Sequence, residues 1–194
     1  MTAREQILTA VRANQPDLTA LPITLGQSNN AVDLQNTFVE VLTAIGGKVI
    51  TTTSYDKVIE HIRSVTTAEH RITSTIEDLA QVINHKDDST LPHSLQNTEL
   101  AVIKAHFGVA ENGAVWVTED LLSERVLPFI TQHLIVILNA HSIVVNMHKA
   151  YETIGADQYG YGTFIAGPSK TADIEQSLVL GAHGSRSMTI FLIS

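Results

Sequence analysis

Residues 162–184 read GTFIAGPSKTADIEQSLVLGAHG and contain an apolar run, a polar turn and a helical pattern in that order. The run Thr163–Ala166 ends at Gly167-Pro168, and the turn Ser169-Lys170-Thr171 follows it. The segment Thr171–Leu180 has helical spacing and ends at Gly181. A strand, a short turn and the start of a helix leave free backbone N–H groups that point toward a ligand.

The turn itself has two interpretations. Loops between strands and helices carry function more often than other loops, so Ser169, Lys170 and Thr171 are candidate ligand contacts. In the alternative, Ser169 or Thr171 caps the helix, and Asp173 and Glu175 complement the helix dipole. Two carboxylates in the first turn argue against a phosphate at that position.

The composition excludes several classes of function. The 194 residues are 44% hydrophobic and 16% charged, as expected for a folded domain of this length. The formal net charge of −8 argues against partners such as nucleic acid or an anionic membrane. Without cysteine, the chain cannot supply a thiolate nucleophile or the ligands of an iron–sulfur cluster. Because it shows neither a spanning apolar run nor a hydrophobic signal segment, we expect a cytoplasmic protein.

Short apolar strands alternate with helical segments along the chain. Thr2-Ala-Arg-Glu5 fits a capping box that begins a helix over residues 2–14. Strands are predicted at Lys48–Thr53, Arg71–Ser74, Ala101–Lys104, Ala114–Thr118, Leu134–Asn139, Thr163–Ala166 and Met188–Ile193. Later helices are predicted at Leu122–Phe129, Met147–Ile154 and Thr171–Leu180.

This alternation predicts a three-layer α/β/α fold with a mostly parallel sheet. Leu134–Leu138 has no polar residue, which is typical of a central strand that is buried on both faces. Residues 84–98 are charged and lack apolar periodicity, so we expect a loop or flap there. We therefore predict a single domain over residues 1–194.

Several common motifs are missing. The sequence has no nucleotide P-loop, no dinucleotide fingerprint and no G-x-S-x-G elbow. Nine histidines are present, but none lie at H-E-x-x-H or H-x-x-x-H spacing. His133, His141 and His148 would meet only if the fold brought them together. We predict no metal site, because geometry and ligand type define such sites.

Two clusters remain as candidates. In the first, Glu111 and the Asn112-Gly113 turn directly precede a strand, and a carboxylate there is a base, a nucleophile or a backbone-capping acceptor. Turn chemistry alone also explains Asn112-Gly113. The second is the 162–184 stretch. Its His183 has two interpretations: a group that exchanges a proton near neutral pH, or only a hydrogen-bond partner of the turn. Arg125 is a further candidate, either as a bidentate donor to an anion or as half of a surface ion pair.

Taken together, these residues resemble the LUD-domain proteins of the lactate-utilisation protein C (LutC, YkgG) group. The likeness includes the helix Ala3-Arg-Glu-Gln-Ile-Leu8 and spans nearly the whole chain. It rests mainly on five further segments: Ala110-Glu-Asn-Gly-Ala-Val-Trp-Val, Arg125-Val-Leu-Pro128, His133-Leu-Ile-Val-Ile-Leu138, Gly167-Pro-Ser-Lys-Thr-Ala-Asp-Ile-Glu175 and Leu178-Val-Leu-Gly-Ala-His-Gly184. The candidate ligand-binding residues are Asn112, Gly113, Arg125, Gly167, Ser169, Lys170, Thr171, Asp173, Glu175, His183 and Gly184.

The resemblance implies a fold like that of NagB, ribose-5-phosphate isomerase (RpiA) and the CoA transferases. It also implies a role in oxidising L-lactate to pyruvate alongside iron–sulfur partner subunits, so the clusters would belong to the partners and this chain would need no cofactor of its own. We expect it to bind a small anionic metabolite, and a homo-oligomer is compatible with this picture.

The chain departs from the family at one turn. The family usually reads Ala-Glu-Thr-Gly-Thr where this chain has Ala110-Glu-Asn-Gly-Ala114, so two hydroxyl donors are lost. The triplet Glu111-Asn-Gly113 is similar to the Glu-Asn-Gly of CoA transferases. An alternative function is therefore a CoA-transferase-like or isomerase-like enzyme that acts on an acyl-CoA or a sugar phosphate and uses Glu111 as catalytic residue.

Overall fold

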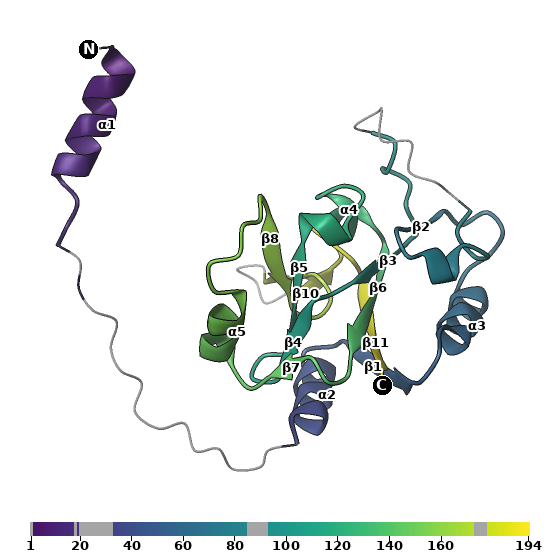
Figure 1. Ribbon diagram of the computed structural model, residues 1–194. Helices are drawn as coiled ribbons and strands as arrows, with labels where there is room; N and C mark the ends of the chain where they lie inside the picture. Colours follow the sequence, from purple (N-terminus) through teal and green to yellow (C-terminus); the bar gives the residue numbers. More distant parts are fainter. Residues whose placement is uncertain (1, 18, 20–32, 85–92, 173–177) are drawn as a thin grey trace. The chain divides into compact units, whose positions relative to one another are not determined.

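The computed structural model describes residues 2–17, 19, 33–84, 93–172 and 178–194 (Figure 1). The chain divides into two compact units, Met1–Ala31 and Val32–Ser194. The first unit contains α1 (Ala3–Ala13), which Thr2 caps. Both hydrogen bonds of the capping box between Thr2 and Glu5 are present, which confirms the helix predicted over residues 2–14.

A five-stranded parallel sheet forms the centre of the second unit. Its order is β1 (Lys48–Thr52), β11 (Ser187–Ile193), β6 (His133–Asn139), β3 (Leu100–Lys104) and β2 (Ile72–Ser74). The predicted central strand is confirmed, because β6 lies in the middle of the sheet and its residues 134–138 are all buried. An apolar run without polar alternation is what burial on both faces requires.

One face of this sheet is covered by α3 (Tyr55–Val65) and the short 3₁₀ helix η1 (Glu77–Leu79). Ser54 caps α3 by accepting a hydrogen bond from the amide of Asp56. The apolar stripe of the helix, Val58, Ile59 and Ile62, packs against the side chains of β3, β6 and β11 that point to this face.

The other face is covered by α2 (Leu34–Ala44), α4 (Leu127–Ile130) and a second sheet. This sheet has the order β7 (Ile143–Val144), β4 (Phe107–Val109), β5 (Ala114–Thr118) and β8 (Gly162–Ile165). The core between the two sheets contains Phe38 and Leu42 from α2. Of the helix predicted at Leu122–Phe129, the structure contains the short α4.

The outer face of the second sheet is covered by α5 (Met147–Ile154). The residues that pack in this layer are Phe107, Trp116, Ala150 and Ile154. The α/β/α class with a mostly parallel sheet is therefore confirmed, and Figure 1 shows α3 and α5 on opposite sides of the two sheets. None of the helices in the described ranges is long and apolar enough to cross a membrane.

Two sequence-based expectations about strands are wrong. β5 and β8 do not join the parallel sheet, because β5 pairs antiparallel with both β4 and β8. The prediction of a helix at Thr171–Leu180 is wrong for the described residues, which instead form two antiparallel strands, β9 (Lys170–Ala172) and β10 (Leu178–Leu180). Thr171 and Ala172 therefore lie in a strand, and the described residues of this segment contain no helix N-terminus that could bind an anion. Most of the loop or flap expected over 84–98 lies outside the described residues.

Candidate functional site

The turn that carries Glu111 connects β4 to β5. Asn112 Oδ1 accepts a hydrogen bond from the amide of Ala114 at 3.0 Å, and Gly113 has a φ of +69°. Glu111 Oε2 accepts a hydrogen bond from the amide of Met147 at 2.9 Å. Met147 is the first residue of α5, so the carboxylate satisfies a free N–H and complements the helix dipole. The structure thus gives Glu111 a capping contact, and its use as catalytic residue stays a prediction.

The two ends of the 162–184 stretch meet. The amide of Ser169 donates to the carbonyl of Ser185 at 2.8 Å, and the amide of Gly181 donates to the carbonyl of Ser169 at 3.1 Å. A Cβ on Gly184 would lie 3.2 Å from Ser169 Cβ. His183 and Lys170 are exposed and Thr171 is half-buried. Asp173 and Glu175 lie outside the described residues.

The Glu111 turn and the Gly167–Lys170 corner both lie along the C-terminal end of α2. A Cβ on Gly113 would lie 3.0 Å from Leu42 Cα, and one on Gly167 would lie 3.2 Å from Ile45 side-chain carbons and carbonyl oxygen. Val115 of β5 pairs with Ile165 of β8; the Glu111 turn directly precedes β5, and the Gly167–Lys170 corner follows β8. The turn and corner are therefore neighbours through the antiparallel sheet, not through the parallel one. Both glycines are buried against the helix, and ligand contact there stays a prediction.

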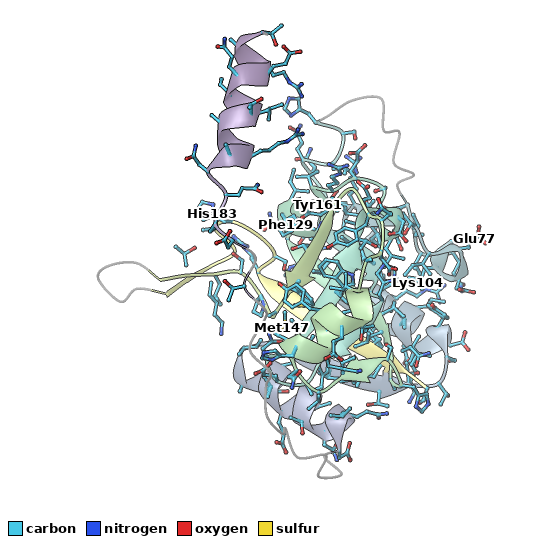
Figure 2. All side chains as sticks on the ribbon, turned by 60° about the vertical axis from the view of Figure 1, so that its left-hand side comes forward. Glu77, Lys104, Phe129, Met147, Tyr161 and His183 are labelled. Carbon is cyan, nitrogen blue, oxygen red and sulfur yellow. The ribbon has the colours of Figure 1, made fainter. Side chains whose placement is uncertain are left out.

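Arg125 does not join this group. Its Nε donates to Glu119 Oε2 at 2.7 Å, and its guanidinium lies 5.7 Å from the ring centroid of Tyr161. These contacts are at the end of β5 opposite to Glu111. In Figure 2, Tyr161 and Met147 mark the two ends and lie well apart. The structure therefore favours the surface ion pair for Arg125.

A cavity of about 600 Å³ opens where β3 and β6 end, and we call it the carboxyl-edge cavity. His106 follows β3, while His141 and Ser142 follow β6, and all three line the cavity. Thr118 and Asp120, from the end of β5, line it as well. The carboxyl ends of parallel strands are where open α/β sheets bind ligands. The volume falls in the range of small-molecule sites, roughly 300–1,000 Å³.

Three polar side chains of the cavity form a hydrogen-bonded chain. His106 Nε2 lies 2.5 Å from Thr118 Oγ1, and Thr118 Oγ1 donates to Asp120 Oδ1. A hydroxyl has one proton, and an ionised carboxylate only accepts, so Thr118 must accept from His106 Nε2–H. In a neutral imidazole this places the proton on Nε2 and the lone pair on Nδ1, away from Thr118. The Thr118 hydrogen bond, more than any other contact, lowers the pKa of Asp120 below its usual value.

Aromatic rings form the apolar wall of the cavity. Phe107, Trp116 and Tyr159 line it, and the ring centroids of Trp116 and Tyr159 lie 5.4 Å apart. Trp116 is only 7% exposed, and the amide of His106 donates to its carbonyl oxygen at 2.9 Å. The wall and the imidazole are thus fixed to each other by strand pairing.

Comparison with known proteins places residues 35–193 in one family. The family model of the LUD domain matches residues 35–193. The chain belongs to the LUD domain family. This confirms the family to which the sequence motifs pointed.

This LUD domain is 31% identical over 99 residues to Lactate utilization protein C of Bacillus pumilus, a match covering 48% of this chain and 41% of the relative. It is 27% identical over 104 residues to the protein of the same name from Oceanobacillus iheyensis, covering 50% and 45%. The chain therefore matches about half the length of these relatives. A crystal structure of a DUF162 family protein from Deinococcus radiodurans has the same fold, with a TM-score of 0.65 and 13% identity over 84% of this chain and 97% of that one.

Motif searching of this LUD domain misses the carboxyl-edge cavity. His106, Thr118 and Asp120 form no known motif, and they come from two different strand ends. One sequence signal could have found it: parallel sheets bind ligands at the carboxyl ends of their strands, so polar residues directly after a predicted strand are candidates. His106 follows the strand predicted to end at Lys104 and would have met that test. Among the described residues, no three His, Cys, Asp or Glu side chains are grouped to hold a metal ion.

Proposed function

We propose that this LUD domain takes part in L-lactate utilisation, the oxidation of L-lactate to pyruvate, in the cytoplasm and together with iron–sulfur partner proteins. The observation that carries the proposal is the shared name of the two relatives, both called Lactate utilization protein C. The family model supports it, because the match extends over residues 35–193. In this proposal the partners hold the clusters, because this chain has no cysteine to ligate them.

The proposal also assigns a small anionic metabolite to the carboxyl-edge cavity. The cavity combines an aromatic wall with a few convergent polar groups, which is the usual composition of a metabolite site. His106 is a group that can take up or release a proton there, because its Nδ1 is free of the Thr118 contact. When it is protonated, the imidazole also supplies a positive charge for a carboxylate.

Growth of the source organism tests the first part. A strain with an in-frame deletion of this chain is expected to grow on pyruvate but not on L-lactate as carbon source. Affinity purification of the tagged chain from lactate-grown cells is expected to bring down proteins with the visible absorption of iron–sulfur clusters. Normal growth of the deletion strain on L-lactate would contradict the proposal.

Fluorescence tests the second part, because Trp116 is the one tryptophan of the chain and lies in the cavity wall. Addition of L-lactate or pyruvate is expected to change its emission in a saturable way. His106→Ala is expected to weaken this binding, whereas Arg125→Ala, at a surface ion pair outside the cavity lining, is a matched control that leaves it unchanged. If neither acid changes the emission and the fold is intact, the assignment of the metabolite to this cavity is wrong.

A further inference from the structure

A second pocket lies at the opposite edge of the parallel sheet, where the strands begin, and we call it the amino-edge pocket. It has a volume of about 320 Å³. Lys48, His133 and Ser187 are the first residues of β1, β6 and β11, and all three line it. His61, from α3, and Leu100, from β3, also line the pocket. It shares no lining residue with the carboxyl-edge cavity, so it is a separate feature of the fold.

Three side chains at this pocket form a chain of hydroxyl, imidazole and carboxylate. Ser187 Oγ lies 2.7 Å from His133 Nδ1, and His133 Nε2 lies 3.6 Å from Glu99 Oε1. His133 and Ser187 are direct partners in the β6–β11 ladder. The amide of His133 also donates to the carbonyl of Glu99 at 2.8 Å. Main-chain pairing therefore holds all three residues in place.

The order of these groups sets the direction of the hydrogen bonds. The carboxylate of Glu99 attracts a proton on His133 Nε2, so the neutral imidazole has its lone pair on Nδ1. That lone pair accepts the hydroxyl proton of Ser187. In the carboxyl-edge cavity the hydroxyl of Thr118 instead donates its hydrogen bond to the carboxylate of Asp120, whose lowered pKa makes it a much weaker base than imidazole. Of these two hydroxyls, Ser187 is the one arranged as a nucleophile beside a base.

We propose that Ser187 is the nucleophile of an acyl-transfer site that hydrolyses small carboxylic esters. Ser187 Oγ attacks the ester carbonyl while its proton moves to His133 Nδ1. The acyl–oxygen bond of the ester then breaks, and the leaving alcohol takes that proton. Water attacks the acyl-serine, gives a proton to His133, and releases the carboxylic acid as the proton returns to Ser187 Oγ. Glu99 is a positioning residue that orients the imidazole and stabilises its positive charge.

The lining of the pocket indicates the kind of ester. Leu100, Leu134 and Ile135 supply an apolar floor that suits a short unbranched acyl chain. Lys48 lines the same pocket, and a positive charge there favours the negative charge that develops on the carbonyl oxygen. Burial, and secondarily the charge of Lys48, lowers the pKa of His61, so His61 is neutral at pH 7. The pocket thus presents one ammonium and apolar walls to the substrate.

The experiment is covalent labelling of the full chain with a fluorophosphonate, which forms a phosphorus–oxygen bond with an activated serine and releases fluoride. The labelled residue is identified by peptide mass, and the labelling rate is compared with hydrolysis of p-nitrophenyl butyrate. We expect one label per chain, on Ser187, and none on Ser187→Ala. His133→Ala is expected to slow labelling by about 100-fold or more, which is the usual contribution of a general base.

Matched variants keep the result interpretable. Ser64→Ala removes a hydroxyl that donates to the carbonyl of His61 at 2.7 Å, and it is expected to label like the wild type. Glu99→Gln is expected to lower the rate and to shift its pH profile, which loss of packing alone would not do. His133→Gln replaces the base with a similar volume if His133→Ala is not folded. Wild-type chain without a label on Ser187, or equal labelling of the folded His133 variants, would overturn the proposal.

Discussion

Replacing Gly113 with alanine tests whether the Glu111 turn is fixed by packing. Gly113 has a φ of +69°, and an L-residue in the left-handed region costs about 1–2 kcal/mol. An alanine Cβ would also lie 3.0 Å from Leu42 Cα and 3.1 Å from Leu42 N. These are backbone atoms, which cannot rotate away, so overpacking adds roughly 1–3 kcal/mol. We expect Gly113→Ala to lower the free energy of unfolding by about 2–5 kcal/mol in total.

Gly46→Ala is the matched control. Gly46 has a φ of +91°, but a Cβ there would meet its nearest atoms, in Lys170 and Pro168, at an ordinary 3.5 Å. It should therefore lose only the conformational cost, about 1–2 kcal/mol. Both variants gain the same benefit from a less flexible unfolded chain, so the difference between them isolates the contact with α2.

Urea unfolding, followed by circular dichroism, measures both values if the slope m is unchanged. Equal losses of stability in the two variants would refute the reasoning, since they would show that α2 does not press on the turn. The space beside Gly113 would then be open to a ligand. A larger loss in Gly113→Ala means that this glycine serves packing.

Three further predictions concern single contacts. Glu111→Ala should lower the free energy of unfolding by about 0.5–2 kcal/mol, because α5 loses a capping acceptor, and Glu111→Gln should recover most of it; no effect of either would favour a purely catalytic Glu111. Arg125→Ala should cost less than about 1 kcal/mol in the same assay, because its ion pair with Glu119 is exposed. In an NMR titration the pKa of Asp120 should be below its usual value and should rise in Thr118→Val. Since the folded-state pKa is lowered, the stabilisation is present above the unfolded-state pKa and is lost as pH falls through the folded one; an unchanged pKa in Thr118→Val would contradict the hydrogen-bond assignment.

The centre of the parallel sheet is predictable because β6 and β11 are buried on both faces. Leu134–Leu138 and the run at Met188–Ile193 allow few other structures, and the predicted bounds agree with β6 and β11 to within one residue. The sequence pattern also predicts β5 as a strand, but it does not predict which sheet the strand joins. A strand pattern reports burial and gives no information about which neighbour pairs with it. Only the Asn112-Gly113 turn indicated a hairpin, and that indication was the correct one.

The segment Thr171–Leu180 shows how a weak period misleads. Ile174 and Leu178 are four residues apart, which fits a helix, but two positions are too few to establish a period. In the structure Thr171 pairs with Val179, and both are β-branched residues that favour strands. The positive φ of Gly181, +79°, comes directly after β10 and does not end a helix.

The chemistry of both pockets was hidden from sequence for one physical reason, which is that strand pairing brings each histidine to its hydroxyl. Thr118 and Asp120 are two residues apart, so their bond forms locally and leaves the imidazole of His106 to donate to the hydroxyl. Ser187 is separated from His133 along the chain, and the β6–β11 ladder places its hydroxyl directly beside the imidazole.

A hydroxyl, an imidazole and a carboxylate are therefore present at both edges of the sheet. At one edge their order leaves a histidine to carry a proton, and at the other it activates a serine. No spacing rule distinguishes these arrangements, because the difference lies in which group stands in the middle or at the end of the chain. Exchanging roles requires moving a hydroxyl between strands, and a point substitution such as Thr118→Ser does not do so. We accordingly expect Thr118→Ser to stay unlabelled by the fluorophosphonate at position 118, while Ser187 labels as in the wild type; a label at position 118 would show that hydrogen-bond order does not control nucleophilicity here.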